Sequence, residues 1–123
     1  IEGISFGILD GVNSILKINE NFNEIFVVGG GSRSKFWIEL LSSILNKNIK
    51  VTDQSEYSAA MGVARLAMYA DKNIEDKESI IKPIQVNNEF LPNKEKISIL
   101  TKRYEIWKDL YSENKKIAPK LLN

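Results

Sequence analysis

The chain has 123 residues, a net charge of +1, and 43% hydrophobic and 27% charged residues, values typical of one ordinary globular domain. It contains no Cys and no His, which excludes disulfides, thiol nucleophiles, Ser-His-Asp triads and nearly all zinc sites. Acidic and basic residues are interleaved, and no apolar run approaches the roughly 18 residues of a membrane span. We therefore expect a cytoplasmic protein with no nucleic-acid or membrane partner, whose chemistry depends on carboxylates, amines, hydroxyls or backbone groups.

The first segment has a helical pattern. The chain opens inside this pattern rather than at a methionine, so we expect it to be a piece of a longer protein. Gly3, Gly7 and Gly11 are four residues apart and would share one narrow helix face, which favours close packing against another element. Apolar residues at helical spacing predict a helix from residue 2 to about residue 18, namely Ile8, Val12, Ile15 and Leu16.

A strand pattern that runs directly into a glycine turn is the most informative feature. The β-branched run 25–28 predicts a buried strand, and Gly29, Gly30 and Gly31 follow it. Ser34 is then placed to cap a helix of about 11 residues that ends near Asn46. Glycines let backbone N–H groups approach a ligand, and a helix N-terminus adds positive partial charge, so the pattern predicts a nucleotide site. The apolar stripe of this helix would be Phe36, Leu40, Leu41, Ile44 and Leu45.

The next segments extend an alternation of strands and helices. Residues 49–52 predict a second strand, which ends at Asp53, and small residues predict a helix from about 55 to 70 that can lie tightly against a sheet or a ligand. A strand, a helix and a second strand in this order predict a parallel α/β layer. Two strands do not form a stable sheet, so we expect the remaining strands to come from another part of the protein or from a partner.

The C-terminal third reads as a connector, a loop and a long helix. Residues 71–85 are charged and contain Pro83, and residues 87–93 contain Pro92, so the first segment is predicted as a connector and the second as a loop. An amphipathic helix then reaches about Lys116. Its apolar stripe is short for a coiled-coil seam, so we expect it to dock on its own domain through Ile97, Leu100, Tyr104, Trp107 and Tyr111.

Two well-known nucleotide motifs match the turn poorly. A dinucleotide-binding fingerprint would need a third glycine where Ser34 stands, although Asp53 ends the next strand at about the right distance for a ribose hydroxyl. A phosphate-binding Walker loop would need a Gly-Lys-Ser/Thr ending, which is missing. The turn therefore favours the adenosine end of a nucleotide.

Three other residues near the turn have ordinary structural interpretations. Arg33 could pair with a phosphate or be solvated, Glu56 fits a helix start, and Trp37 fits the core.

Three segments together resemble the C-terminal domain of FGGY-type carbohydrate kinases. They are Glu2-Gly-Ile-Ser-Phe-Gly-Ile-Leu-Asp-Gly11, Val27-Val-Gly-Gly-Gly-Ser-Arg-Ser-Lys-Phe-Trp37 and Glu56-Tyr-Ser-Ala-Ala-Met-Gly-Val-Ala-Arg-Leu-Ala67. Their order and spacing match the family, and the resemblance covers essentially all 123 residues. Within the family, the stretches 29–37, 62–67 and 91–111 are most similar to the xylulose kinase subgroup.

This resemblance implies an α/β fold that is the C-terminal part of an actin-like, RNase H-like ATPase domain, rich in helices and with a short parallel strand pair. Residues 1–123 would be the nucleotide-binding portion of a sugar kinase whose N-terminal sugar-binding domain precedes them. Gly30 and Ser34 map onto residues that contact the adenine nucleotide in relatives, with Gly29 and Gly31 in the same cofactor-binding turn. Some relatives carry Asn in place of Ser34, and Val63 is bulkier than the family's usual Ala.

The resemblance also implies a reaction and its partners. The full-length enzyme would use ATP and Mg²⁺ to phosphorylate a ketose, D-xylulose to D-xylulose 5-phosphate, and a homodimer is a candidate assembly. The catalytic Asp and the magnesium ligands are expected outside residues 1–123, so no residue of this chain is assigned a catalytic or metal-binding role, and the chain alone should transfer no phosphate. A gluconate, ribulose or glycerol kinase of the same family, or a non-catalytic actin-like nucleotide-binding module, remain alternatives.

Overall fold

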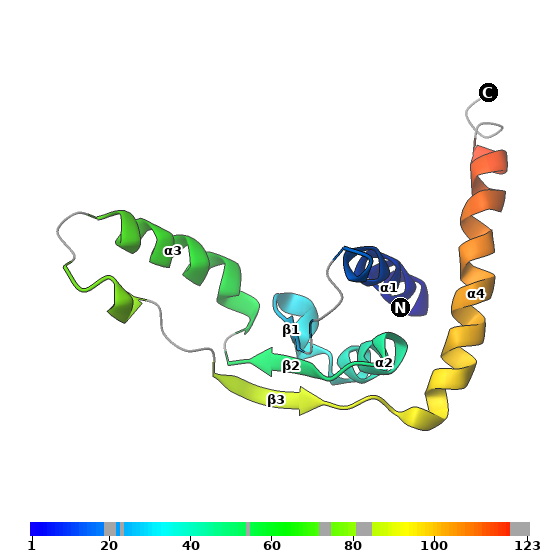
Figure 1. Cartoon of the computed structure of the whole chain (residues 1–123), viewed down its shortest axis with the longest axis horizontal. Coiled ribbons are helices and arrows are strands. Elements are labelled where there is room, and N and C mark those ends of the chain that lie inside the picture. Colours follow the sequence, from blue (N-terminus) through cyan, green and yellow to red (C-terminus); the bar gives the residue numbers. More distant parts are fainter. Residues whose placement is uncertain (19–21, 23, 54, 72–74, 81–84, 119–123) are drawn as a thin grey trace.

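The computed structural model describes residues 1–123 except 19–21, 23, 54, 72–74, 81–84 and 119–123. Figure 1 shows α1, α2 and α4 on one side of the molecule, with α3 extending away on the other side. In chain order the elements are helix α1 (Glu2–Leu16), strand β1 (Ile25–Val27), 3-10 helix η1 (Gly30–Arg33), α2 (Lys35–Leu45), β2 (Ile49–Thr52), η2 (Ser55–Tyr57), α3 (Ser58–Ala70), η3 (Glu78–Ile80), β3 (Val86–Phe90) and α4 (Lys94–Ile117).

The predicted limits of α2 are confirmed by its caps. The Ser34 side chain accepts a hydrogen bond from the backbone N–H of Trp37 at 3.4 Å, which satisfies one of the unpaired N–H groups of the first turn. Asn46 ends the helix in the left-handed conformation, with φ of 49°. Asparagine tolerates this conformation better than most residues, because its short side chain can bond locally. Two polar residues thus fix an 11-residue helix.

The parallel strand pair is also confirmed. Ile25 lies opposite Ile49 and Val27 lies opposite Val51, with α2 as the crossover between β1 and β2. A parallel pair requires such a crossover, because a tight turn can only return a strand antiparallel. The chain therefore has the expected helix-rich α/β fold.

The prediction of a loop over 87–93 is wrong for its first part. Residues Val86–Phe90 form strand β3, which pairs antiparallel with β2 and gives the sheet order β1-β2-β3. Ile49 lies opposite Phe90, and the backbone N–H of Asp53 donates to the carbonyl of Gln85 at 3.1 Å. The third strand of the described sheet thus comes from this chain. Asparagine-rich strands have low intrinsic propensity, so the ladder with β2 explains why the segment is extended.

One face of α2 covers the sheet. Ile38 and Ile49 are fully buried, and they form the centre of a core cluster with Leu41, Leu45 and Val51. The predicted stripe of α2 is wrong at one position, because Phe36 is 64% exposed while Ile38, which the stripe left out, is 0% exposed. Residues 38, 41 and 45 recur at helical spacing, so they share the face that meets the sheet.

The docking of α4 on its own domain is confirmed for the first half of the helix. Leu100 and Tyr104 are buried against Phe6 of α1 and Ile44 of α2. The Tyr104 hydroxyl donates to Asp10 at 2.9 Å, and burial, followed by this carboxylate, raises the pKa of Tyr104. A buried phenol with a partner for its proton is stable, whereas an unpaired one would be costly.

The glycine face of α1 is used at one position only. A Cβ at Gly3 would lie 3.4 Å from Nε1 of Trp107, so Gly3 is where α4 approaches α1 closely. A Cβ at Gly7 or Gly11 would meet nothing within 4 Å. Among the described residues, the predicted close packing of another element on this face is therefore confirmed at Gly3 and is not found at Gly7 or Gly11.

Two buried serines of α2 hold the turn between β3 and α4. The Ser42 hydroxyl donates to the carbonyl of Leu91 at 3.1 Å. The Ser43 hydroxyl accepts from the backbone N–H of Asn93 at 3.0 Å. The Asn93 side chain in turn caps α4 by accepting from the N–H of Glu95 at 3.0 Å. The start of α4 is thus fixed by polar groups inside the core.

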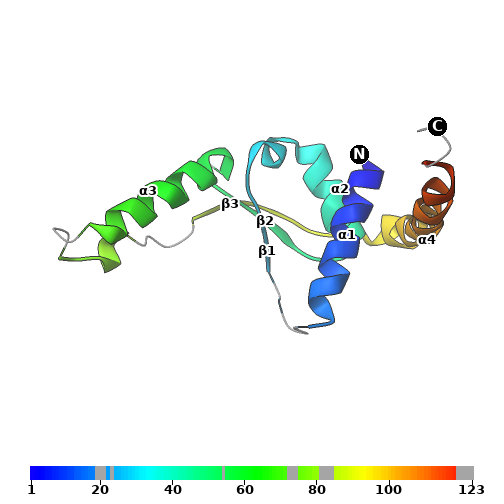
Figure 2. The same cartoon turned by 90° about the horizontal axis from the view of Figure 1, so that it is seen from above.

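Helix α3 does not lie against the sheet, the first of the two surfaces for which its small residues were expected to suit it. None of its residues is buried, and Figures 1 and 2 show it pointing away from the other helices. Its exposed apolar residues include Val63 at 68% and Leu66 at 72%. In the part of the chain that the structure describes, no helix combines the length and apolar character needed to cross a membrane.

The burial difference within α2 gives a direct test of the core. We predict that Ile38→Ala lowers the free energy of unfolding by about 2–5 kcal/mol, because it leaves a cavity between α2 and the sheet. The matched change Phe36→Ala should alter it by no more than about 0.5 kcal/mol, because that ring is mostly exposed. Urea denaturation followed by circular dichroism measures both. Equal losses would contradict this packing of α2 on the sheet.

Candidate functional site

Two turns meet at the carboxyl ends of β1 and β2. The backbone N–H of Gly29, directly after β1, donates to the carbonyl of Ser55, at the start of η2, at 2.7 Å. The two residues are brought together because parallel neighbouring strands end at the same edge of a sheet. We call the contact between η1, with Gly29, and η2 the turn junction.

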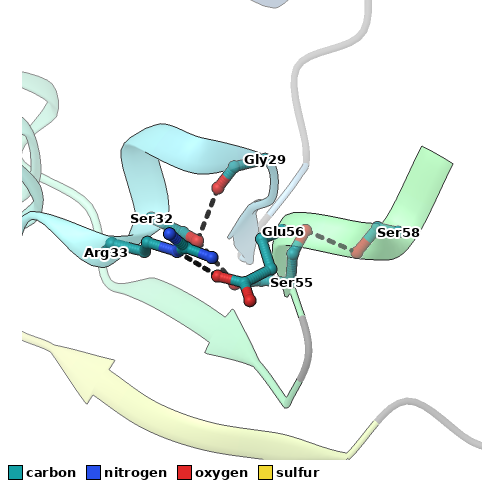
Figure 3. Close-up of polar contacts among 6 residues, drawn as sticks. All are labelled: Gly29, Ser32, Arg33, Ser55, Glu56 and Ser58. Atoms are coloured by element: carbon teal, nitrogen blue, oxygen red, sulfur yellow. Dashed lines mark hydrogen bonds and ion pairs between the residues drawn. The ribbon is translucent and has the colours of Figure 1, made fainter. Parts of the chain in front are cut away.

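Two buried serines strengthen the turn junction. The Ser32 hydroxyl donates to the carbonyl of Gly29 at 2.7 Å and lies in hydrogen-bond contact with the Ser55 hydroxyl. Because the Ser32 proton is used on Gly29, the Ser55 hydroxyl donates to Ser32. Figure 3 shows these contacts together with the bond from the Ser58 hydroxyl to the carbonyl of Ser55. The serines therefore hold η1, η2 and the start of α3 as one unit.

An ion pair closes the turn junction on its outer side. The Nε–H of Arg33 donates to the carboxylate of Glu56, as Figure 3 shows. This hydrogen bond is the main reason that the pKa of Glu56 lies below its usual value and that of Arg33 above it. The contribution of this ion pair to the stability of the fold is fully present at pH values above the ordinary pKa of a glutamate. It is lost as the pH falls through the lowered pKa of Glu56. Arg33 is thus engaged by a carboxylate of this chain.

The three glycines of the turn have different roles. Gly29 has φ of 91° and ψ of −179°, a conformation that is open essentially to glycine alone. At Gly31 a Cβ would lie 2.5 Å from the ring of Trp37, so this glycine makes room for the indole. At Gly30 a Cβ would meet nothing within 4 Å. The same is true at Gly29, but Gly30 is the exposed residue of the three, so its backbone is the most open part of the turn.

Trp37 joins the turn to α1, in agreement with its predicted core role. Its ring packs beside Gly31, and its indole N–H donates to the hydroxyl of Ser5 at 2.9 Å. Ser5 is fully buried. A Trp N–H inside a protein needs such an acceptor. The position of η1 is thus linked to α1 as well as to the sheet.

A cleft of about 950 Å³ begins at the turn junction and runs between α2 and β3. Ser32, Arg33, Ser55 and Glu56 line its end at the junction. Its walls combine apolar side chains with charges of both signs. They include Phe36, Leu40, Val51, Phe90 and Leu91 as well as Lys35, Glu39, Asp53, Glu89 and Lys96.

The structure places the predicted site residues in one turn. Gly29, Gly30, Gly31 and Ser34 lie within or next to η1, and Ser34 caps α2. None of the four lines the cleft, although their neighbours Ser32, Arg33 and Lys35 do. Sequence reasoning missed the pairing of Ser32 with Ser55 and of Arg33 with Glu56. Both pairs follow the ends of adjacent parallel strands, and this was the signal available for finding them.

The chemistry available at the turn junction is binding rather than bond making. The first N–H groups of a helix such as η1 have no acceptor within the helix, and they carry positive partial charge. Among the described residues, no group of three or more Asp or Glu side chains is placed to hold a metal ion.

The comparisons with known proteins agree with this fold. Residues 1–70 match the C-terminal domain of the FGGY family of carbohydrate kinases. Over 123 residues the chain is 31% identical to a xylulose kinase of Staphylococcus epidermidis, covering 99% of this chain and 25% of that protein. The solved structure of a xyloylose kinase from Brucella ovis superposes with a TM-score of 0.77 at 28% identity, over 94% of this chain and 24% of that one.

The chain belongs to the FGGY family of carbohydrate kinases. A gluconate kinase from Lactobacillus acidophilus is a further structural neighbour, with a TM-score of 0.66 and 25% identity over 92% of this chain and 23% of that one. The expected fold class, part of an actin-like ATPase domain, is confirmed by these likenesses. The chain spans about a quarter of the length of the proteins that it matches.

The conformation of Gly29 gives a test of the turn junction. We predict that Gly29→Ala lowers the free energy of unfolding by about 1–3 kcal/mol, because alanine is strained at this φ and ψ. Gly30→Ala is the matched control, because a Cβ there contacts nothing within 4 Å. Denaturant unfolding of the two variants measures the difference. If Gly30→Ala were the more damaging change, the assignment of the two glycines would be wrong.

Proposed function

We propose that the complete protein transfers the γ-phosphoryl group of ATP to a sugar, D-xylulose in particular, and that this chain supplies the adenosine side of the ATP site. The main support is the 31% identity to a xylulose kinase over 99% of the chain, which includes the glycine turn. The family membership supports a sugar as the acceptor.

The described residues fit a nucleotide at the turn in three respects. The backbone of Gly30 is open to approach, because no atom lies where a Cβ would stand. The Ser34 side chain is exposed and its hydroxyl retains hydrogen-bonding capacity beyond the cap to Trp37. The adjoining cleft offers the flat apolar surface of Phe36, which is 64% exposed. ATP would supply the phosphoryl group, and these residues would hold the adenosine end of ATP, which is uncharged.

The residues for the chemical step are proposed to lie outside residues 1–123. Phosphoryl transfer needs a base for the acceptor hydroxyl, cations near the phosphates and exclusion of water. The chain has no His, and the described residues contain no cluster of three or more carboxylates placed to share a metal ion. We infer that a domain preceding this chain in the protein supplies the catalytic Asp, the magnesium ligands and the sugar pocket, and closes over the turn.

Gluconate is the second candidate substrate. The gluconate kinase from Lactobacillus acidophilus is a structural neighbour at 25% identity, close to the 28% of the xyloylose kinase. Kinases that act on different sugars would share a nucleotide-binding portion. Likeness in this portion therefore supports phosphoryl transfer from ATP more strongly than it supports the identity of the sugar.

A substrate panel tests the proposed reaction. The complete protein with Mg-ATP should phosphorylate D-xylulose faster than ribulose, gluconate or glycerol, measured by coupled detection of ADP. A preference for gluconate or glycerol would refute the sugar and leave the reaction class intact, and no activity on any acceptor would refute the reaction. The 123-residue chain alone should give no product above background, because it lacks the second domain that would close over the nucleotide and exclude water.

Substitution of Gly30 tests the nucleotide contact. We predict that Gly30→Val in the complete enzyme raises KM for ATP about tenfold or more, because the side chain would fill the space that the nucleotide needs. Gly7→Val is the matched control, because its Cβ also contacts nothing within 4 Å but lies on α1. The KM for the sugar should be unchanged in both variants. An unchanged KM for ATP in Gly30→Val would contradict the contact.

A further inference from the structure

The short helix η1 carries Gly30 at one end and Arg33 at the other. A 3-10 helix has poorer hydrogen-bond geometry than an α-helix, so a piece of this length has little stability of its own. Two of its four residues are glycines, which lose the most conformational freedom when they become ordered. The position of the Gly30 backbone therefore depends on contacts that η1 makes with other elements.

Two consecutive residues of η2 supply these contacts at the turn junction. The carbonyl of Ser55 accepts from the N–H of Gly29, just before η1, and the Ser55 hydroxyl contacts that of Ser32 inside it. Glu56 accepts from the Nε–H of Arg33, the last residue of η1, as Figure 3 shows. Ser55 is buried and Glu56 is half-buried. The contact of Glu56 thus completes the hold on η1 from the surface.

We propose that Glu56 is a positioning residue for the nucleotide: its ion pair with Arg33 fixes the far end of η1 and so keeps the Gly30 backbone where ATP meets it. This inference rests on the proposed nucleotide site at the turn. Glu56 acts through Arg33 and does not touch ATP itself. A turn held in its binding conformation before ATP arrives has less ordering entropy to lose, so the pair raises the affinity for the nucleotide.

Charge balance favours this role over a direct contact of Arg33 with the nucleotide. The guanidinium and the carboxylate are in hydrogen-bond contact, so the two side chains together carry no net charge. The adenosine end of ATP is uncharged as well, and a neutral pair beside it adds no Coulomb attraction. The pair would therefore change ATP binding through the geometry of the turn.

The ion pair between Glu24 and Lys50 provides a matched control. Glu24 directly precedes β1 and Lys50 lies in β2, so this pair joins the same two strands at their amino ends. Its side chains are 54% and 22% exposed, close to the 67% of Arg33 and 26% of Glu56. Loss of either pair should cost similar stability, but of the two only the Arg33–Glu56 pair adjoins the glycine turn.

The test compares two charge reversals in the complete protein. Glu56→Arg should raise both the dissociation constant of Mg-ADP and the KM for ATP about fivefold or more, because two guanidinium groups then repel each other at the end of η1. The kcat and the KM for the sugar should stay within about twofold of the parent values. Glu24→Arg should change none of these quantities. Isothermal titration calorimetry and steady-state kinetics measure them, and thermal melting checks that each variant folds.

A charge swap distinguishes positioning from direct contact. The double change Arg33→Glu with Glu56→Arg rebuilds the ion pair in the opposite sense, so it should bring the dissociation constant of Mg-ADP back to within about twofold of the parent value. A folded swap variant that binds as weakly as Glu56→Arg would mean that one of the two side chains touches the nucleotide, and would overturn the proposal. Unchanged affinity in Glu56→Arg would also overturn it and would leave the nucleotide site intact. A parent protein that binds no Mg-ADP would refute the proposed function, and this inference with it.

Amide hydrogen exchange without nucleotide tests the positioning step by itself. The backbone N–H of Ser32 donates to the carbonyl of Gly29, and that of Ser34 donates to the carbonyl of Gly31, both at 3.1 Å, so these two amides report the order of η1. Glu56→Arg should speed their exchange severalfold, and Glu24→Arg should leave it unchanged. Unchanged exchange at both amides in Glu56→Arg would overturn the proposal even if the affinity for Mg-ADP fell.

Discussion

The hydrogen bond from the N–H of Gly29 to the carbonyl of Ser55 is the constraint on which the geometry of the site depends. It ties the turn after β1 to the turn after β2, and the Ser32, Ser55 and Arg33–Glu56 contacts surround it. Because η1 leads directly into α2, the direction of that helix is set where the turn is held. Gly30 is left open at the outside of this arrangement.

Helix α2 transmits this constraint to the rest of the chain. Its sheet-facing side is buried on β2, and its buried Ser42 and Ser43 hold the turn that leads to α4. Helix α4 then closes over Phe6 and Ile44. Residues 86–117 lie beyond the 1–70 segment that matches the family, yet they pack directly against the helix that begins at the glycine turn. The C-terminal segment therefore supports the candidate site without forming it.

Local signals explain what could be predicted from the sequence. Ser34 and Asn46 cap α2 through contacts within a few residues, and the apolar run 25–28 predicts the strand that the structure has at Ile25–Val27. The predicted burial of this strand is wrong, because none of its three residues is buried and Val28 is exposed. Strand β3 could not be read this way, because Asn87 and Asn88 have low strand propensity and are extended only by pairing with β2. The exposure of Phe36 also depends on tertiary packing, since helical spacing alone places it with apolar neighbours.

The candidate site likewise combines a part that local sequence signals predict and a part that depends on tertiary contacts. The glycine turn is visible in the sequence because it is a local pattern of a strand, three glycines and a helix, whereas the Arg33–Glu56 pair depends on two strands becoming neighbours. Amide hydrogen exchange of the complete protein with and without Mg-ADP tests the central claim most directly. The account predicts slower exchange at residues 30–34 when nucleotide is bound. Nucleotide binding that protects other segments and leaves residues 30–34 unchanged would contradict it.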